Sequence, residues 1–203
     1  MMRLWIEPNL TGDREIEYGF IERWMPVTGG LALDIGAGGV TRLAGAARAN
    51  GYRVLSVDKT NADIRGDIRR VELPRVNLIL CCSTVEHIGL AGRYGEAADD
   101  PDGDLTTMRR MARILEPGGC MLLTVPVGID RVHGSMHRVY GAERLPRLLE
   151  GFTVTADQYW VRVAHGWMEV DRDTALSQYS VTVNPEDWQG SVYGLAGFVL
   201  EKR

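Results

Sequence analysis

The stretch LALDIGAGG, residues 31–39, joins a short apolar run to a turn that holds three glycines. Glycine adopts a positive φ at low cost and leaves its backbone open to the close approach of a ligand, as nucleotide-binding turns require. Gly36 and Gly38 suit this role, and the first amides of a helix after the turn would favour an anion beside them. Such turns also serve only to pack a helix on a sheet, so the surrounding sequence has to decide.

Apolar runs of strand length alternate with helix-like stretches along the chain, a pattern typical of a parallel sheet covered by helices. The clearest strand is VNLILCC, Val76–Cys82, which is apolar enough to be buried on both faces. Other strands are predicted at 31–35, 53–57, 120–125, 152–163 and 193–201, and helices at 15–24, 41–50, 105–115 and 142–150. We expect a doubly wound, mostly parallel α/β sheet of seven strands with an antiparallel edge hairpin.

Composition narrows the class of protein. The chain has 203 residues and a net charge of −4 without a basic block, which gives nucleic-acid binding no electrostatic support. The sequence has no apolar run long enough to span a membrane, and residues 1–24 are interrupted by charges, so we expect a cytoplasmic protein with no membrane partner. The three cysteines match neither a disulfide framework nor a paired zinc motif.

Two acids give the glycine turn its context. Asp58 ends the predicted second strand, where its carboxylate could accept hydrogen bonds from both ribose hydroxyls of a nucleoside. A dinucleotide enzyme would use the same device, but its G-x-G-x-x-G turn needs a glycine at position 41, which is Thr41. Asp34, Gly36 and Gly38 form D-x-G-x-G instead, and this pattern points away from NAD.

From about residue 31 to residue 126 the sequence resembles the class I S-adenosylmethionine-dependent methyltransferases. IRGDIRR, ILCCSTVEHIG and ILEPGGCMLLTVP match further segments of that family, whereas Val40 replaces a glycine of its longer pattern. The resemblance implies a Rossmann-like fold and S-adenosyl-L-methionine as the cofactor, with Asp58 at the ribose and Asp67 at the adenine. The implied cofactor-binding residues are Asp34, Gly36, Gly38, Asp58, Lys59, Asp67, Ile68 and Ser83.

Residues 85–152 resemble a smaller family of methyltransferase-like domains that has no assigned reaction and is often associated with polysaccharide and sugar pathways. This resemblance implies O-methylation of a small hydroxylated acceptor, such as a sugar moiety. Methylation of a nitrogen or a carboxylate stays open, as does a non-catalytic cofactor-binding or scaffold role, and a homodimer is compatible with the sequence. We expect one domain, in which residues 1–30 form a helical segment, 31–126 the cofactor-binding core and 127–203 the acceptor-side loops and edge strands.

Three histidines follow predicted strands at the edge where open α/β sheets bind ligands. Methyl transfer is an in-line displacement, so the protein has to align the acceptor and remove its proton, and a group with a near-neutral pKa suits that task. His137 or His87 is the predicted general base, and Glu86 is an acid, a base or a group that orients His87. The predicted acceptor-binding residues, for which packing is the alternative, are Arg93, Tyr94, His133, Arg138 and Tyr140.

The acidic run DDPDGD, residues 99–104, could suggest a cation site because hard cations take oxygen ligands. It lacks the closing glutamate of a calcium loop, and Asp104 is well placed to cap the helix that follows. His133 and His137 have a spacing that zinc sites use on helices, but Gly134 and Ser135 between them disfavour a helix. We therefore expect no metal.

Overall fold

The computed structural model describes residues 13–91, 99–133, 137–163, 166–179 and 193–203. Its main sheet has eight strands in the order β3-β2-β1-β4-β5-β10-β8-β9. These strands are β1 (Gly30–Ile35), β2 (Tyr52–Asp58), β3 (Ile64–Arg65), β4 (Val76–Cys82), β5 (Leu115–Val127), β8 (Phe152–Val163), β9 (Gly166–Val170) and β10 (Gly194–Lys202). A separate hairpin pairs β6 (Arg131–His133) with β7 (His137–Val139).

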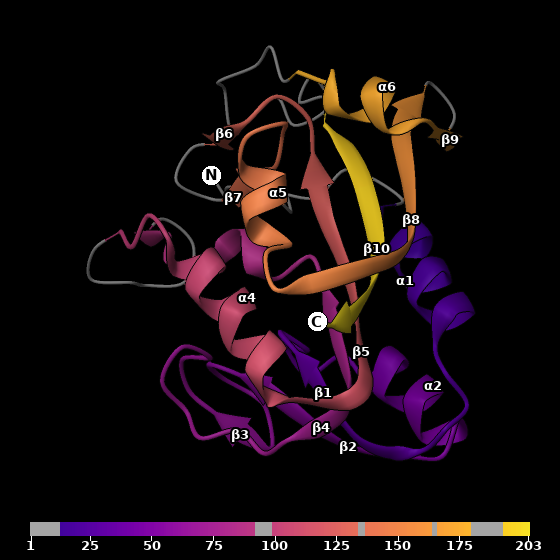
Figure 1. Cartoon of the computed structure of the whole chain (residues 1–203), viewed down its shortest axis with the longest axis vertical. Helices are drawn as coiled ribbons and strands as arrows, with labels where there is room; N and C mark the ends of the chain where they lie inside the picture. The colour runs from indigo at the N-terminus through magenta and orange to yellow at the C-terminus, as the bar shows by residue number, and fades with distance from the viewer. Residues whose placement is uncertain (1–12, 92–98, 134–136, 164–165, 180–192) are drawn as a thin grey trace, which may run out of the picture.

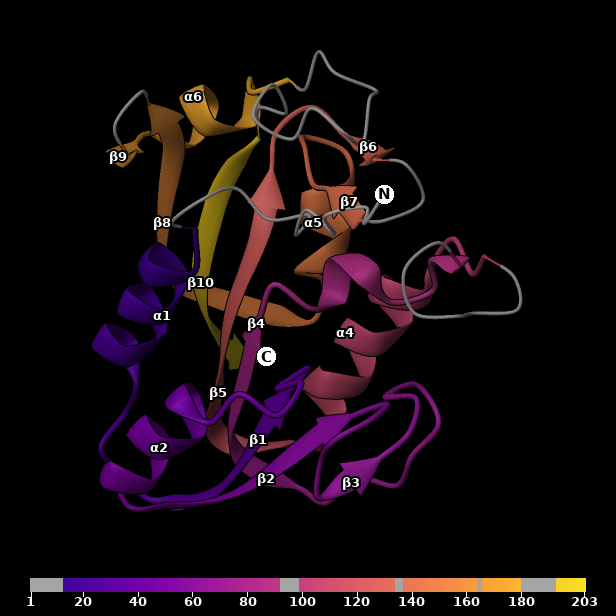
Figure 2. The same cartoon turned by 180° about the vertical axis from the view of Figure 1, so that it is seen from behind.

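Helices cover both faces of the main sheet. They are α1 (Asp13–Trp24), α2 (Arg42–Ala49), α4 (Gly103–Ile114), α5 (Arg144–Leu148) and α6 (Arg172–Leu176), with a 3-10 turn, η1 (Val85–His87), after β4. Figures 1 and 2 show α1 and α2 together on one face and α4 and α5 on the other. Each face therefore needs its own apolar core.

The central strand β4 supplies both cores. Its residues alternate, so that Leu78 and Leu80 pack on the α1 and α2 side while Ile79 and Cys81 pack on the α4 and α5 side. All four residues have no solvent exposure. This alternation explains why the sequence of β4 is almost uniformly apolar, as expected for a parallel strand buried on both faces.

Strand order creates the crevice that positions the site. β1 pairs in parallel with β2 on one side and with β4 on the other. The connections after β1 and β4 therefore lead to opposite halves of the sheet, and open α/β sheets bind ligands at the carboxyl ends of strands where this happens. Both the glycine turn after β1 and the η1 turn after β4 lie at this point.

The predicted fold class is confirmed, with differences at the carboxyl-terminal edge. β8 and β10 pair antiparallel as expected, but β10 also pairs with β5, and the edge is formed by β9. The sheet has eight strands where seven were predicted, and β3 and β9 match none of the ranges predicted from the sequence, because β3 has only two residues and the half-exposed β9 lacks a clear alternation. Residues 131–139, predicted as loop, contain the β6–β7 hairpin. Among the described residues, no helix is long and apolar enough to cross a membrane.

Candidate functional site

A cavity of about 480 Å³ lies at the carboxyl ends of β1, β2 and β4. All eight predicted cofactor-binding residues line it: Asp34, Gly36, Gly38, Asp58, Lys59, Asp67, Ile68 and Ser83. His87 and Ile88 of the segment after β4 also line it, and α1 adds Arg14 and Tyr18. Residues predicted from four separate stretches of sequence are thus brought to one wall.

The glycines of the turn after β1 serve two different purposes. Gly36 has φ +75°, and a Cβ atom there would lie 2.2 Å from Thr84 Oγ1, so close packing of the protein itself requires glycine. Gly38 has φ +56°, and the nearest heavy atom to a Cβ there is Gly36 O at 4.0 Å. Because Gly38 lines the cavity, its lack of a side chain leaves backbone bare on the cavity wall.

Asp58 is held at the end of β2 facing this turn. Its carboxylate accepts hydrogen bonds from the amide of Thr60 at 2.9 Å, from Thr60 Oγ1 at 3.0 Å and from the amide of Gly38 at 3.2 Å. These bonds fix the direction of the carboxylate, and the carboxylate oxygens can still accept further bonds because each has more than one lone pair.

Asp67 is held by a bidentate contact with Arg69. Arg69 Nε lies 2.9 and 3.1 Å from the two carboxylate oxygens of Asp67, and Arg69 Nη2 lies 2.5 Å from one of them. Partial burial favours the neutral acid, but the hydrogen bonds and charge of Arg69 hold the pKa of Asp67 below its ordinary value. Arg69 Nη1 also binds Asp100 Oδ2 at 2.9 Å, which ties this part of the wall to the start of α4.

Asp34 is an acid of the cavity wall whose charged form is disfavoured by burial. The residue is 4% exposed, and burial raises its pKa to about 6, against a small opposing effect of Arg48. A buried acid with a raised pKa in a cavity is a candidate functional group, since the fold alone gains nothing from it.

The cavity wall after β4 depends on a buried acid of α1, Glu17, which is 1% exposed. It accepts hydrogen bonds from Ser83 Oγ, from Thr124 Oγ1 at 3.0 Å and from Arg14 Nη1 at 2.8 Å. Ser83 is the one non-glycine residue with positive φ in the described part of the chain, at +41°. Glu17 therefore helps to hold a strained backbone at the cavity wall.

Arg14, Glu17 and Tyr18 were not predicted from the sequence. A signal was present, because Glu17 shares the inward face of its helix with the buried Phe20 and Ile21, three and four positions later. A carboxylate on an apolar face needs a buried partner, and that requirement would have pointed to a polar contact with the sheet.

The three predicted histidines come together beside the cavity. The ring centroids of His87 and His137 are 6.1 Å apart, and those of His133 and His137 are 5.2 Å apart. His87 Nε2 lies 3.6 Å from Glu86 Oε1, and both residues are buried. Burial and the charge of Arg131 lower the pKa of His133. The catalytic roles of His87, His137 and Glu86 stay predictions.

Arg138 and Tyr140, which were predicted to bind the acceptor or to pack, lie in the interior, in agreement with packing. Both side chains are buried, and Tyr140 donates its hydroxyl hydrogen bond to Asp104 Oδ2 at 3.0 Å. Asp104 does not cap α4 as predicted, because it lies inside the helix and is fully buried, with a hydrogen bond from Arg144 Nη2 at 2.6 Å. Arg93 and Tyr94 lie outside the described residues.

Acid, cysteine and histidine side chains in the described part of the chain form no group of three or more that could hold a metal ion. The cysteines Cys81, Cys82 and Cys120 are free thiols, and burial raises the pKa of each. Their thiols are therefore poor nucleophiles and poor metal ligands.

A family model described as Caenorhabditis protein of unknown function, DUF268, matches residues 67–160. The match includes Asp67 and the three histidines but not the glycine turn. No protein with a curated description matches the chain.

Solved structures share the fold of this chain at low sequence identity. A candidate methyltransferase from Bacillus halodurans is 15% identical with a TM-score of 0.63, over 93% of this chain and 99% of its own. The chain has the Rossmann-like methyltransferase fold.

The 1,6-didemethyltoxoflavin-N1-methyltransferase of Burkholderia thailandensis, solved with 1,6-didemethyltoxoflavin and S-adenosylhomocysteine, is 17% identical with a TM-score of 0.58, over 94% of this chain and 78% of its own. The [4+2]-cyclase SpnF is 14% identical with a TM-score of 0.59, over 93% and 80%. Fold alone therefore does not fix the reaction.

Proposed function

We propose that the chain is an S-adenosyl-L-methionine-dependent methyltransferase that methylates a hydroxyl group of a small acceptor such as a sugar moiety. The observation that carries this proposal is that all eight predicted cofactor-binding residues line one cavity. Its volume of about 480 Å³ suits a small-molecule ligand, for which sites of about 300–1,000 Å³ are usual. A protein of the same fold contains S-adenosylhomocysteine in its structure.

The cavity wall offers groups that fit each part of the cofactor. Asp67, Ile68 and Asp58 line the cavity, where Asp67 and Ile68 would contact the adenine and Asp58 would accept hydrogen bonds from the ribose hydroxyls. The bare backbone at Gly38 would allow the ligand to approach closely, and Ser83 and Arg14, which also line the cavity, would contact the methionine portion. The guanidinium of Arg14 would complement a carboxylate there.

When bound, S-adenosyl-L-methionine supplies an activated methyl group, because the sulfonium sulfur that carries it is a good leaving group and becomes a neutral thioether. The protein has to bring the acceptor oxygen in line with the carbon–sulfur bond and exclude water from that line. His87 or His137 would take the hydroxyl proton, and this is supported by the position of His87 on the cavity wall with the ring of His137 beside it, at 6.1 Å between centroids. Glu86, beside His87, would stabilise the imidazolium that results.

Calorimetry with S-adenosyl-L-methionine and S-adenosylhomocysteine tests the cofactor assignment directly. We expect both ligands to bind, and absence of binding by the folded protein would refute the proposal. Transfer of radiolabelled methyl to sugar nucleotides and other hydroxylated small molecules then tests the acceptor class. Binding without transfer to any acceptor would favour the non-catalytic alternative.

A pH–rate profile separates a hydroxyl acceptor from a carboxylate acceptor. Hydroxyl methylation assisted by histidine should show an ascending limb in the range where imidazole loses its proton. A carboxylate is already ionised there and needs no base, so a flat profile would favour the carboxylate alternative.

A further inference from the structure

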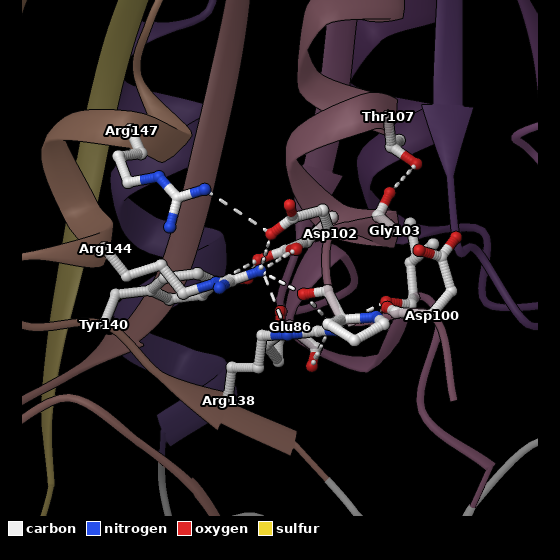
Figure 3. Close-up of polar contacts among 12 residues, drawn as sticks. Glu86, Asp100, Asp102, Gly103, Thr107, Arg138, Tyr140, Arg144 and Arg147 are labelled. Carbon is white, nitrogen blue, oxygen red and sulfur yellow. Dashed lines mark hydrogen bonds and ion pairs between the residues drawn. The ribbon is translucent and has the colours of Figure 1, made fainter.

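Arg138 is the largest fully buried side chain of the described residues, and it binds backbone rather than solvent or cavity. Its Nη1 donates to Ile88 O at 2.7 Å and to Glu86 O at 3.4 Å. Its Nη2 donates to Asp100 O at 3.1 Å and to Pro101 O at 3.3 Å. One guanidinium thus joins the segment after β4 to the segment before α4 (Figure 3).

The carbonyls bound by Nη1 lie on either side of His87. η1 is only three residues long, and its own hydrogen bonds run from the amide of His87 to Thr84 O and from the amide of Ile88 to Val85 O, both at 3.1 Å. Arg138 adds a donor to the carbonyls of the residues on either side of His87, and this restricts the backbone of the turn further.

The same strand also carries His137. In β7 the neighbouring residues His137 and Arg138 point to opposite faces. The ring of His137 contacts the ring of His87, while Arg138 binds the carbonyls of Glu86 and Ile88, the residues on either side of His87. One short strand therefore presents the second imidazole and holds the turn that carries the first.

A buried acid fixes the guanidinium in turn. Asp104 Oδ2 lies 3.7 Å from Arg138 Nε, and Asp104 itself receives hydrogen bonds from Tyr140 and Arg144. Leaving any of these charges buried without its partner is costly, so the arrangement has little freedom to shift.

We propose that Arg138 is a positioning residue that sets the distance between His87 and His137 by holding the backbone on both sides of His87. This inference rests on the proposed function, in which one of the two imidazoles takes the acceptor proton. It assigns Arg138 no contact with acceptor or cofactor.

Arg138→Lys is the test, because lysine keeps the charge but has no planar fork that spans four carbonyls. Arg144→Lys is the matched control, since Arg144 shares Asp104 but has no hydrogen bond to the carbonyls flanking His87. In protein labelled at histidine, an NMR cross-relaxation peak between the rings of His87 and His137 should be present in the wild type and in Arg144→Lys and lost in Arg138→Lys. In the methyl-transfer assay Arg138→Lys should lower kcat by about 100-fold, the effect of a misplacement of about 1 Å, with little change in acceptor KM or in cofactor affinity.

The NMR result decides the positioning role whether or not the protein transfers methyl groups. If the wild type binds no cofactor, the proposed function fails, while the ring contact still reports on Arg138. A wild-type protein without the ring contact, or a folded Arg138→Lys that keeps it, would overturn the inference. Loss of the whole fold in Arg138→Lys but not in Arg144→Lys would also overturn it, because Arg138 would then support the fold rather than one turn.

Discussion

Replacement of Gly38 by alanine is the sharpest test of the cavity as a cofactor site. A Cβ atom at this position meets no protein atom closer than 4.0 Å, yet it lies on the cavity wall. The added methyl should therefore remove ligand space without disturbing the packing of the protein. Gly36→Ala should instead disturb the packing of the protein, because its Cβ atom would lie 2.2 Å from Thr84 Oγ1.

The expected costs follow from backbone and contact. Alanine at positive φ costs about 1–2 kcal/mol, and overpacking adds about 1–3 kcal/mol. A chain of this length loses about 2–4 °C in Tm for each kcal/mol. Gly38→Ala, with only the backbone cost, should lower Tm by about 2–8 °C, and Gly36→Ala, with both costs, by about 4–20 °C.

Gly118→Ala is the matched control, since Gly118 has φ +75°, a Cβ there meets nothing within 4 Å, and the residue is away from this cavity. Thermal unfolding gives the stability of each variant, and calorimetry gives its affinity for S-adenosylhomocysteine. We expect Gly38→Ala to bind at least about 10-fold more weakly than Gly118→Ala, a loss of about 1.4 kcal/mol. Equal affinity in these two variants would refute the placement of the ligand against the turn.

Substitutions around the cavity should separate stability, binding and turnover. The folded-state pKa of Asp34, about 6, lies above its unfolded value of 3.8, so ionisation of Asp34 removes stability as pH rises through this window. Asp34→Asn should stabilise the protein at pH 8 by up to about 3 kcal/mol, and urea denaturation should show no gain below about pH 4. Asp58→Ala should weaken binding of S-adenosylhomocysteine by about 10–100-fold in calorimetry, through loss of hydrogen bonds to a charged group. His137→Ala should lower kcat by about 100-fold or more with cofactor affinity nearly unchanged, and a parallel loss of affinity would contradict its role as base.

The parts of the fold that local sequence encodes were predictable. The alternation of apolar runs and helices gave the parallel half of the sheet, and β4 and β8 have their predicted bounds. β9 was not predicted, because an edge strand with one neighbour needs no strong apolar pattern. The eight predicted residues that line the cavity could be read from the sequence because each lies at the end of a strand or shortly after one, whereas Arg14 and Tyr18 of α1 carry no such local signal.

The buried hydrogen bonds and ion pairs between segments that are distant in the sequence were not predictable. Asp104 precedes a run of helical residues, and Arg138 lies in a stretch that reads as loop, so a helix cap and a ligand-binding residue are the local expectations for them. In the structure Asp104 and Arg138 contact each other, although they are 34 positions apart in the sequence. The start of α4 and β7 come together only in the folded protein, where the charged side chains of Asp104 and Arg138, which the sequence suggests are exposed, form a buried ion pair.

Features that oppose folding gather at the cavity. Asp34 is a buried acid at the end of β1, and Ser83 has a left-handed backbone at the end of β4. On α1, next to the cavity-lining Arg14, burial and the charge of Glu17 raise the pKa of Asp13 to about 7. A sequence selected for stability alone would remove such groups, since neutral or apolar replacements are more stable at buried sites. These groups lie where three parallel strands end, and we infer that they cost folding free energy but contribute to the binding of a ligand. Asp34→Asn, which is expected to stabilise the protein, should therefore weaken cofactor binding.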